Sequence, residues 1–236
     1  MTHHRKKPGS AGQKKEVRPL AVKDPGSALT HFIGFVLSLL LLPVLLLHAV
    51  RQHTSPIGIF SLGVFVLSMI LLYAASTAYH TFDLSPAANL RLKKVDHIMI
   101  FVLIAGSYTP ICLIALPHSV GIPLLIAIWS CALIGGVIKF FWVTCPKWFS
   151  SVLYITMGWL CIFALPQLLE RLPGAAFAFL LAGGVIYTIG GIIYALKLVH
   201  WNKSRPFIGS HEVFHLFVLA GNLCHVLLAY FYLCGM

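Results

Sequence analysis

The chain has 236 residues, of which 59% are hydrophobic and only 10% are charged. Charged residues make up about a quarter of an ordinary soluble chain, so this composition excludes a soluble globular protein. Lys and Arg number 17 against 6 Asp and Glu, but few polar segments are available to form a basic face for nucleic acid. We therefore assign the surplus positive charge to attraction for anionic lipids and to control of membrane topology, with membrane lipids as the expected partners.

The six cysteines show neither a disulfide framework nor a thiolate metal site. None belongs to a CxxC pair, and most lie inside apolar runs. We interpret them as small core residues.

Residues 1–27 form a basic tail that contains Gly and Pro, and we expect it to be flexible. No cleavable signal peptide is visible, because the first apolar run is too long for a signal h-region. That run is expected to act as an uncleaved first span.

Residues 28–236 are predicted to form an all-α membrane domain of seven transmembrane helices. About 20 apolar residues cross a bilayer as a helix, and short polar turns separate seven stretches of this kind. The predicted spans are 28–50, 57–81, 95–116, 121–143, 149–169, 175–197 and 210–234.

The distribution of Lys and Arg predicts the orientation of these spans. Only Arg51 and Arg171 fall on the side opposite the N-terminus, and all the others fall on the N-terminal side. By the positive-inside rule the N-terminus is cytoplasmic and the C-terminus is outside, as expected for a multi-pass membrane protein. This orientation excludes a G-protein-coupled receptor, and the absence of Lys from 210–234 excludes a retinal protein.

Several ionisable residues fall within spans, where they are costly and usually functional. His80 ends the second span, Asp96 begins the third, and His211 and His215 begin the seventh. Given the predicted topology, three separate helices bring these groups to one level at the cytoplasmic face.

The spacing of these residues indicates a metal site. His211 and His215 are four residues apart, so they share one helix face, and Ser76 precedes His80 by the same interval. With His80 as a third ligand, the set is a His₃ site with an open position for water, which is typical of catalytic zinc. Asp96 could orient or deprotonate such a water, and Ser76 could hydrogen-bond it or a ligand. Imidazole ligands also suit copper, iron and nickel.

Three further intramembrane histidines are open to other interpretations. His225 lies roughly 21 Å along the helix from His211 and is interpreted as a hydrogen-bonded core residue. His31 either supports the metal site or makes a helix contact. For His97, packing or an interhelical bond is favoured, because it points about 100° away from Asp96.

The segment HEVFH at 211–215 also matches the H-E-x-x-H signature of zinc metalloproteases, in which the Glu is the general base. An intramembrane protease would need a distal acidic ligand, and Asp96 is the only acid at that depth. Glu212 has a simpler role in facing the lipid headgroups, so we rank a protease below the His₃ site.

The sequence resembles the hemolysin III family of bacterial membrane proteins, the prokaryotic branch of the progestin and adipoQ receptors (PAQR). The match runs through nearly all of residues 27–234, in the segments LTHFIG, STAYH, VDHIMIFVLIAGSYTP, LYITMGW, LAGGVIYTIGGIIY and HEVFHLFVLAGNLCH. The resemblance implies seven spans with a cytoplasmic N-terminus. One departure precedes the first span, where Asp24 and Ser27 stand in place of the family's usual acidic residues and Asn.

The resemblance also implies a zinc ion held by His80, His211 and His215, with Asp96 contacting the zinc-bound water and Ser76 completing the cluster. Alkaline ceramidases belong to the wider superfamily, so the leading hypothesis is a zinc-dependent hydrolase of a lipid amide or ester at the cytoplasmic leaflet. The rival hypothesis is a non-catalytic lipid sensor in membrane homeostasis, or a cytolysin (hemolysin), with a structural zinc. The sequence specifies neither the substrate nor the oligomeric state.

Overall fold

The computed structural model describes residues 22–199 and 209–236. Within these residues every regular element is helical, which confirms the all-α prediction. Seven helical segments there are long and apolar enough to cross a membrane. The elements are α1 (Pro25–Arg51), α2 (Pro56–Thr81), α3 (Pro86–Pro110), η1 (Ile111–Ala115), α4 (His118–Phe141), α5 (Lys147–Gly158), η2 (Leu160–Ala164), α6 (Leu165–Arg171), α7 (Gly174–Leu196), α8 (Ser210–Leu228) and η3 (Ala229–Leu233).

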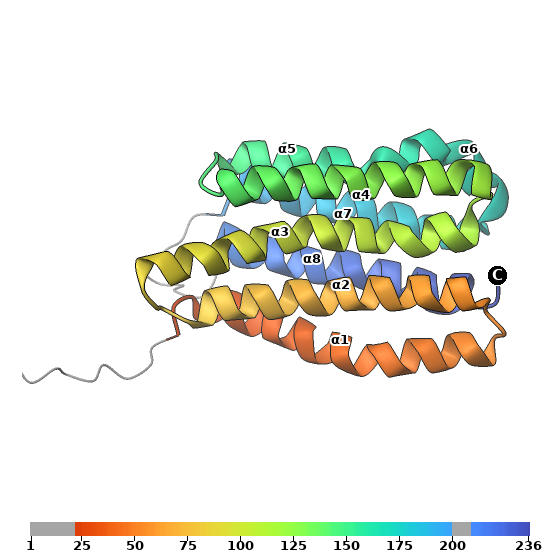
Figure 1. Ribbon diagram of the computed structural model, residues 1–236, viewed down its shortest axis with the longest axis horizontal. Coiled ribbons are helices and arrows are strands. Elements are labelled where there is room, and N and C mark those ends of the chain that lie inside the picture. Colours follow the sequence, from red (N-terminus) through yellow and green to blue (C-terminus); the bar gives the residue numbers. More distant parts are fainter. Residues whose placement is uncertain (1–21, 200–208) are drawn as a thin grey trace, which may run out of the picture.

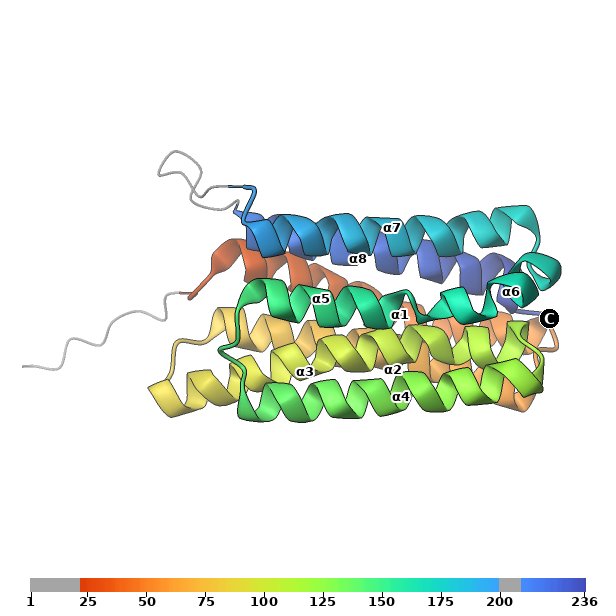
Figure 2. The same ribbon diagram turned by 90° about the horizontal axis from the view of Figure 1, so that it is seen from above.

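The helices lie side by side along the long axis of one bundle (Figure 1). The beginning of α1 and the C-terminus lie at opposite ends of the bundle, as an odd number of crossings requires. Helix α1 packs against α2 and α8, and α5 lies between α7 and the pair α3 and α4 (Figure 2). The C-terminus of α2 and the N-termini of α1, α3 and α8 therefore lie together at the same end of the bundle.

Six of the seven spans begin earlier than predicted, α3 by nine residues and the others by one to three. Helix α1 begins at Pro25 instead of residue 28, and α3 begins at Pro86 instead of residue 95. Proline is favoured in the first helical turn because its missing N–H needs no partner there, and the Ser85 hydroxyl caps α3 by accepting from the N–H of Ala88 at 3.3 Å. Residues 91–94, with three basic side chains, are therefore helical and not part of a turn. Most of the tail predicted at 1–27 lies outside the described residues.

The fifth span is interrupted, although the sequence predicted one continuous stretch at 149–169. Helix α5 ends at Gly158, and the chain continues as the 3₁₀-helix η2 and then α6. The hydroxyl of Tyr108 donates to the carbonyl of Gly158 at 2.6 Å and accepts from the N–H of Cys161 at 2.9 Å. Backbone groups freed by the break are thus satisfied inside the protein, as the apolar environment demands.

The distribution of side chains is that of a membrane protein. Large apolar side chains such as Leu40, Leu133 and Phe163 are exposed on the outside of the bundle. The interior contains many small polar residues and histidines. The apolar exterior faces lipid, so polar groups are placed where the protein itself can satisfy them.

Candidate metal centre

Three histidines from two helices meet at one end of the bundle. His80 lies in the last turn of α2, and His211 and His215 lie in the first two turns of α8. One ring nitrogen of each lies within 4.8 Å of the other two. The Nε2 atoms of His80 and His211 are 3.0 Å apart. The structure thus brings together the three residues that the sequence predicted as ligands.

Asp24, just before α1, orients the ring of His80. Its Oδ2 lies 2.9 Å from Nδ1 of His80, and its backbone N–H donates to the carbonyl of His80. A carboxylate only accepts, so Nδ1 carries the hydrogen and Nε2 keeps its lone pair for a metal. The hydrogen bond from His80 also holds the pKa of Asp24 below its usual range, which keeps the carboxylate ionised.

Thr30, in the second turn of α1, plays the same part for His215. Its Oγ1 lies 3.2 Å from Nδ1 of His215 and also 3.0 Å from the carbonyl oxygens of Gly26 and Ser27. The single hydroxyl hydrogen is directed at these carbonyls, so Oγ1 accepts from the Nδ1–H of His215. The Nε2 atom of His215 is therefore free to face the other two histidines.

His31 stacks directly on His215. The ring centroids are 3.5 Å apart and the ring planes differ by 7°. Both ring nitrogens of His31 are buried and have no hydrogen-bond partner among the described residues. This stacking is a contact between α1 and α8 and also reaches a proposed ligand, so it agrees with both interpretations left open by the sequence.

The two proposed catalytic groups line the cavity beside this cluster. Ser76 lies one turn before His80 on α2, and its buried hydroxyl has no partner in the described part of the chain. Asp96 on α3 is buried, and its Oδ2 lies 3.3 Å from Nδ1 of His97. Both Ser76 and Asp96 border the same internal cavity as His211 and His215.

Glu212 does not have the surroundings of a protease general base. Its Oε1 accepts from the hydroxyl of Ser27 at 2.6 Å, and its Oε2 accepts from the N–H of Gly209 at 2.9 Å. The carboxylate therefore caps the beginning of α8 and ties that helix to α1. Both of its oxygens are already used in these contacts.

The chemistry of the donor set suits a metal ion such as zinc. Zn–N distances of about 2.0–2.1 Å in a tetrahedral site place two ligand nitrogens roughly 3.3 Å apart. The Nε2 atoms of His80 and His211 are 3.0 Å apart, and all three ligand nitrogens lie within 4.8 Å of one another. The hydroxyl of Ser76 and the ring nitrogens of His31 border the same cavity and have no hydrogen-bond partner among the described residues. Buried polar atoms without partners are rare and often mark a bound ion or water.

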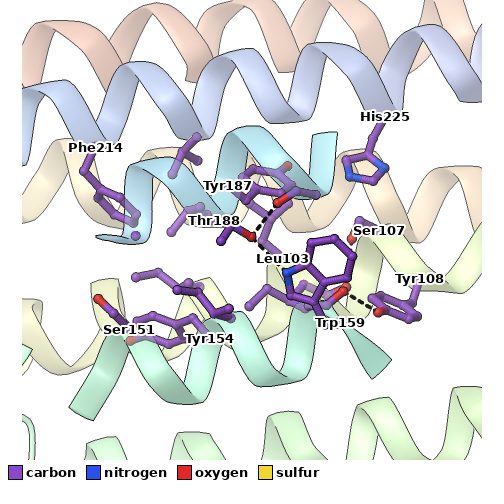
Figure 3. A pocket seen from close by; sticks show the side chains of 18 of the residues that line it. Leu103, Ser107, Tyr108, Ser151, Tyr154, Trp159, Tyr187, Thr188, Phe214 and His225 are labelled. Carbon is purple, nitrogen blue, oxygen red and sulfur yellow. Dashed lines mark hydrogen bonds between the residues drawn. The ribbon is translucent and has the colours of Figure 1, made fainter. Parts of the chain in front are cut away.

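A cavity of about 330 Å³ runs from the histidines along the bundle axis between α3, α5, α7 and α8. Its walls are mainly apolar and aromatic, with Trp159 donating from Nε1 to Thr188 (Figure 3). His225 lies deep in this cavity, roughly 15 Å along α8 from His215. Its Nδ1 has no hydrogen-bond partner within the described residues, so the prediction of a hydrogen-bonded core histidine is wrong for this atom.

His97 also lies on the cavity wall, and its Nδ1 is 2.9 Å from the carbonyl of Lys93. Lys139 was counted among the basic residues on the N-terminal side of the membrane. It lies in the last turn of α4 and is fully buried, which a count of charges does not reveal.

Comparison with known proteins decides the family. Residues 21–226 match the family model described as "Haemolysin-III related". The chain belongs to the haemolysin III family. It is 39% identical over 210 residues to "Hemolysin-3" of Bacillus cereus, covering 89% of this chain and 91% of that protein. It is 38% identical to the "Hemolysin-3 homolog" of Bacillus subtilis (strain 168), covering 89% and 94%.

This membership confirms the resemblance inferred from the motifs. Together with the seven apolar helices, it identifies a multi-pass protein of the bacterial cell membrane. Membership of the haemolysin III family identifies neither a bound metal ion nor a reaction.

Three residues near the histidines were not predicted as site residues: Asp24, Ser27 and Thr30. All of them come from the beginning of α1. A sequence signal was present, since a polar cluster at the start of an apolar span needs a partner inside the protein. The residues that these side chains contact lie 56 and 185 positions away in the chain. The sequence alone does not indicate which residues they contact.

Proposed function

We propose that this haemolysin III protein is a zinc-dependent hydrolase of lipid amides or esters, acting at the cytoplasmic leaflet. The observation that carries the proposal is the position of the three histidines at one end of an apolar cavity. His80, His211 and His215 would hold the ion through their ring nitrogens. When bound, zinc polarises a carbonyl and lowers the pKa of a coordinated water.

The chain's own residues would bind and orient the substrate. The apolar walls between α3, α5 and α7 suit an acyl chain, which would bring its carbonyl to the histidine end of the cavity. Asp96 would accept a proton from the attacking water, and the free hydroxyl of Ser76 would donate a hydrogen bond to the carbonyl oxygen. The positive-inside orientation assigns this end to the cytoplasmic leaflet.

The experiment is a direct assay of hydrolysis. Purified protein loaded with zinc is incubated with a panel of ceramides, N-acyl lipids and lipid esters, and released fatty acid is measured by mass spectrometry. We expect zinc-dependent turnover, which is the part of the rate lost on dialysis against EDTA, to fall by about 10²–10⁴-fold in Asp96→Asn, the range for loss of a general base. If no substrate in the panel releases fatty acid, or if Asp96→Asn keeps the wild-type rate, the proposal fails.

A second candidate rests on the names of the relatives, which describe hemolysins. On this alternative the protein is a cytolysin or a non-catalytic lipid sensor, and the metal only holds α2 to α8. Erythrocyte lysis by purified protein, compared with fatty acid release from the same preparation, separates the two candidates. Lysis without any release of fatty acid would support the second.

A further inference from the structure

A second cluster of reactive side chains lies where α4 turns into α5, outside the histidine cluster. Lys139 is in the last turn of α4, Cys145 is in the connecting turn, and Ser150 is in the first turns of α5. All three are buried, with exposed fractions of 0%, 7% and 4%. The metal centre uses none of them.

Lys139 has unusual partners for a buried amine. Its Nζ donates to Ser150 Oγ and, at 3.0 Å, to Cys145 Sγ, while Cys145 Sγ is 3.3 Å from Ser150 Oγ. In the described parts of the chain, no carboxylate forms an ion pair with Lys139. A full charge at this depth without a carboxylate is costly, so a buried ionisable side chain of this kind indicates a functional role.

The role of the cluster depends on which of its side chains faces the cavity. Ser150 lines the large cavity, whereas Lys139 and Cys145 do not. Lys139 is therefore positioned behind Ser150, and only the serine hydroxyl can meet a molecule in the cavity. A nucleophile that faces substrate, a base in hydrogen-bond contact behind it, and a third group that orients the base form the signature of an activated nucleophile.

We propose that Ser150 and Lys139 form a serine–lysine dyad that takes an acyl group from a lipid ester or amide bound in the cavity. Serine–lysine pairs are one of the recurring variants of the catalytic triad. This inference goes beyond the zinc-dependent function, because it assigns a separate nucleophile that needs no metal. Cys145, held 3.0 Å from Nζ, orients the amine.

The proposed reaction needs no reactant besides the bound lipid and water. The Oγ proton passes to Nζ of Lys139 while Oγ bonds to the acyl carbonyl carbon. The C–N bond of an amide or the C–O bond of an ester then breaks, and the leaving amine or alcohol takes the proton from Nζ. Water releases the fatty acid from Ser150 by the same steps, with Lys139 accepting the proton of the water.

The test uses the full-length protein in detergent micelles and a hexadecyl fluorophosphonate probe, whose chain suits the apolar cavity. Attack by Oγ forms an O–P bond and releases fluoride, which leaves a permanent mass increase on the serine. We expect peptide mass spectrometry to place this label on Ser150 in the wild-type protein. Label found elsewhere, or no label at all, overturns the proposal without the need for any variant.

Variants then separate a base from a structural lysine. Lys139→Arg keeps a long side chain with N–H donors but cannot accept a proton at working pH, so we expect labelling to slow by about 100-fold or more. Ser151 is the matched control, since it also lines the cavity and is equally buried. Ser151→Ala is expected to leave the label on Ser150.

The outcome is independent of the zinc hypothesis. Dialysis of the wild-type protein against EDTA before the probe is added is expected to keep the label on Ser150, so a failure of metal-dependent hydrolysis does not affect this result. Wild-type labelling rates in Lys139→Arg would show that the lysine only supports the turn, and would overturn the dyad.

Discussion

The carboxylate of Asp24 lies 2.9 Å from Nδ1 of His80, and the backbone N–H of Asp24 reaches the carbonyl of the same histidine. The residues are 56 positions apart in the chain, so the contact exists only because α1 and α2 pack together. Hydrogen bonds of this kind fix the tautomer and the orientation of metal-ligating histidines. Asp24 thus holds Nε2 of His80 toward His211.

Removal of this carboxylate should weaken metal binding without abolishing it. We expect Asp24→Ala to lower zinc affinity by about 10–100-fold, the usual effect of losing such a partner. Competition with a chromogenic chelator measures the change. Asp83→Ala is the matched control, because Asp83 is an exposed acidic residue at the same end and bonds only Asn89 in the described chain. Equal affinities in the two variants would contradict the role of Asp24.

Removal of a ligand should have a larger effect. His80→Ala is expected to reduce zinc bound per chain, measured by inductively coupled plasma mass spectrometry after dialysis, from about one to well below one. His225→Ala serves as a control, because His225 lies too far along α8 to share the ion. If metal content is unchanged in His80→Ala, His80 is not a ligand.

The sequence predicted the parts of this protein that depend on local composition. Span number follows from apolar run length, and the i, i+4 pair His211 and His215 follows from helical periodicity. These signals are contained within single segments. The proximity of His80 to this pair could also be predicted, since alternating spans return to the same membrane face.

Contacts between distant segments were not predictable in the same way. Thr30 and His31 were visible only as polar residues at the start of a span, and their pairing with His215 depends on how α1 packs on α8. Lys139 was taken for a topological charge because a count of basic residues ignores burial. The break after Gly158 depends on Tyr108, a residue of another helix.

The depth of the cavity predicts a chain-length preference. Ser107 lines the cavity on α3, roughly 16 Å along the helix from Asp96. Figure 3 shows Ser107 beside His225 and Tyr108, at the deep end. We expect Ser107→Leu to lower hydrolysis of a palmitoyl substrate by about tenfold or more, while a hexanoyl substrate is still cleaved. A parallel loss for both chain lengths would indicate general damage and contradict this position for the acyl chain.

The glycine pair 135–136 in α4 offers a test of the fold itself. A Cβ at Gly135 would overlap the ring of Phe101 on α3, whereas a Cβ at Gly136 would find Ile98 Cγ2 at an ordinary 3.6 Å. The Phe101 ring cannot move aside easily, because it is buried and packs on Tyr154 with ring centroids 4.7 Å apart.

Gly135→Ala should therefore force α3 and α4 apart, with a loss of about 1–3 kcal/mol in the free energy of unfolding. Gly136→Ala adds the same methyl group one residue away, so it controls for helix propensity and for the presence of the side chain. Denaturant unfolding in detergent micelles, followed by tryptophan fluorescence, compares the two variants with the wild type. Equal stability of the two variants would contradict the close approach of α3 and α4 at Gly135.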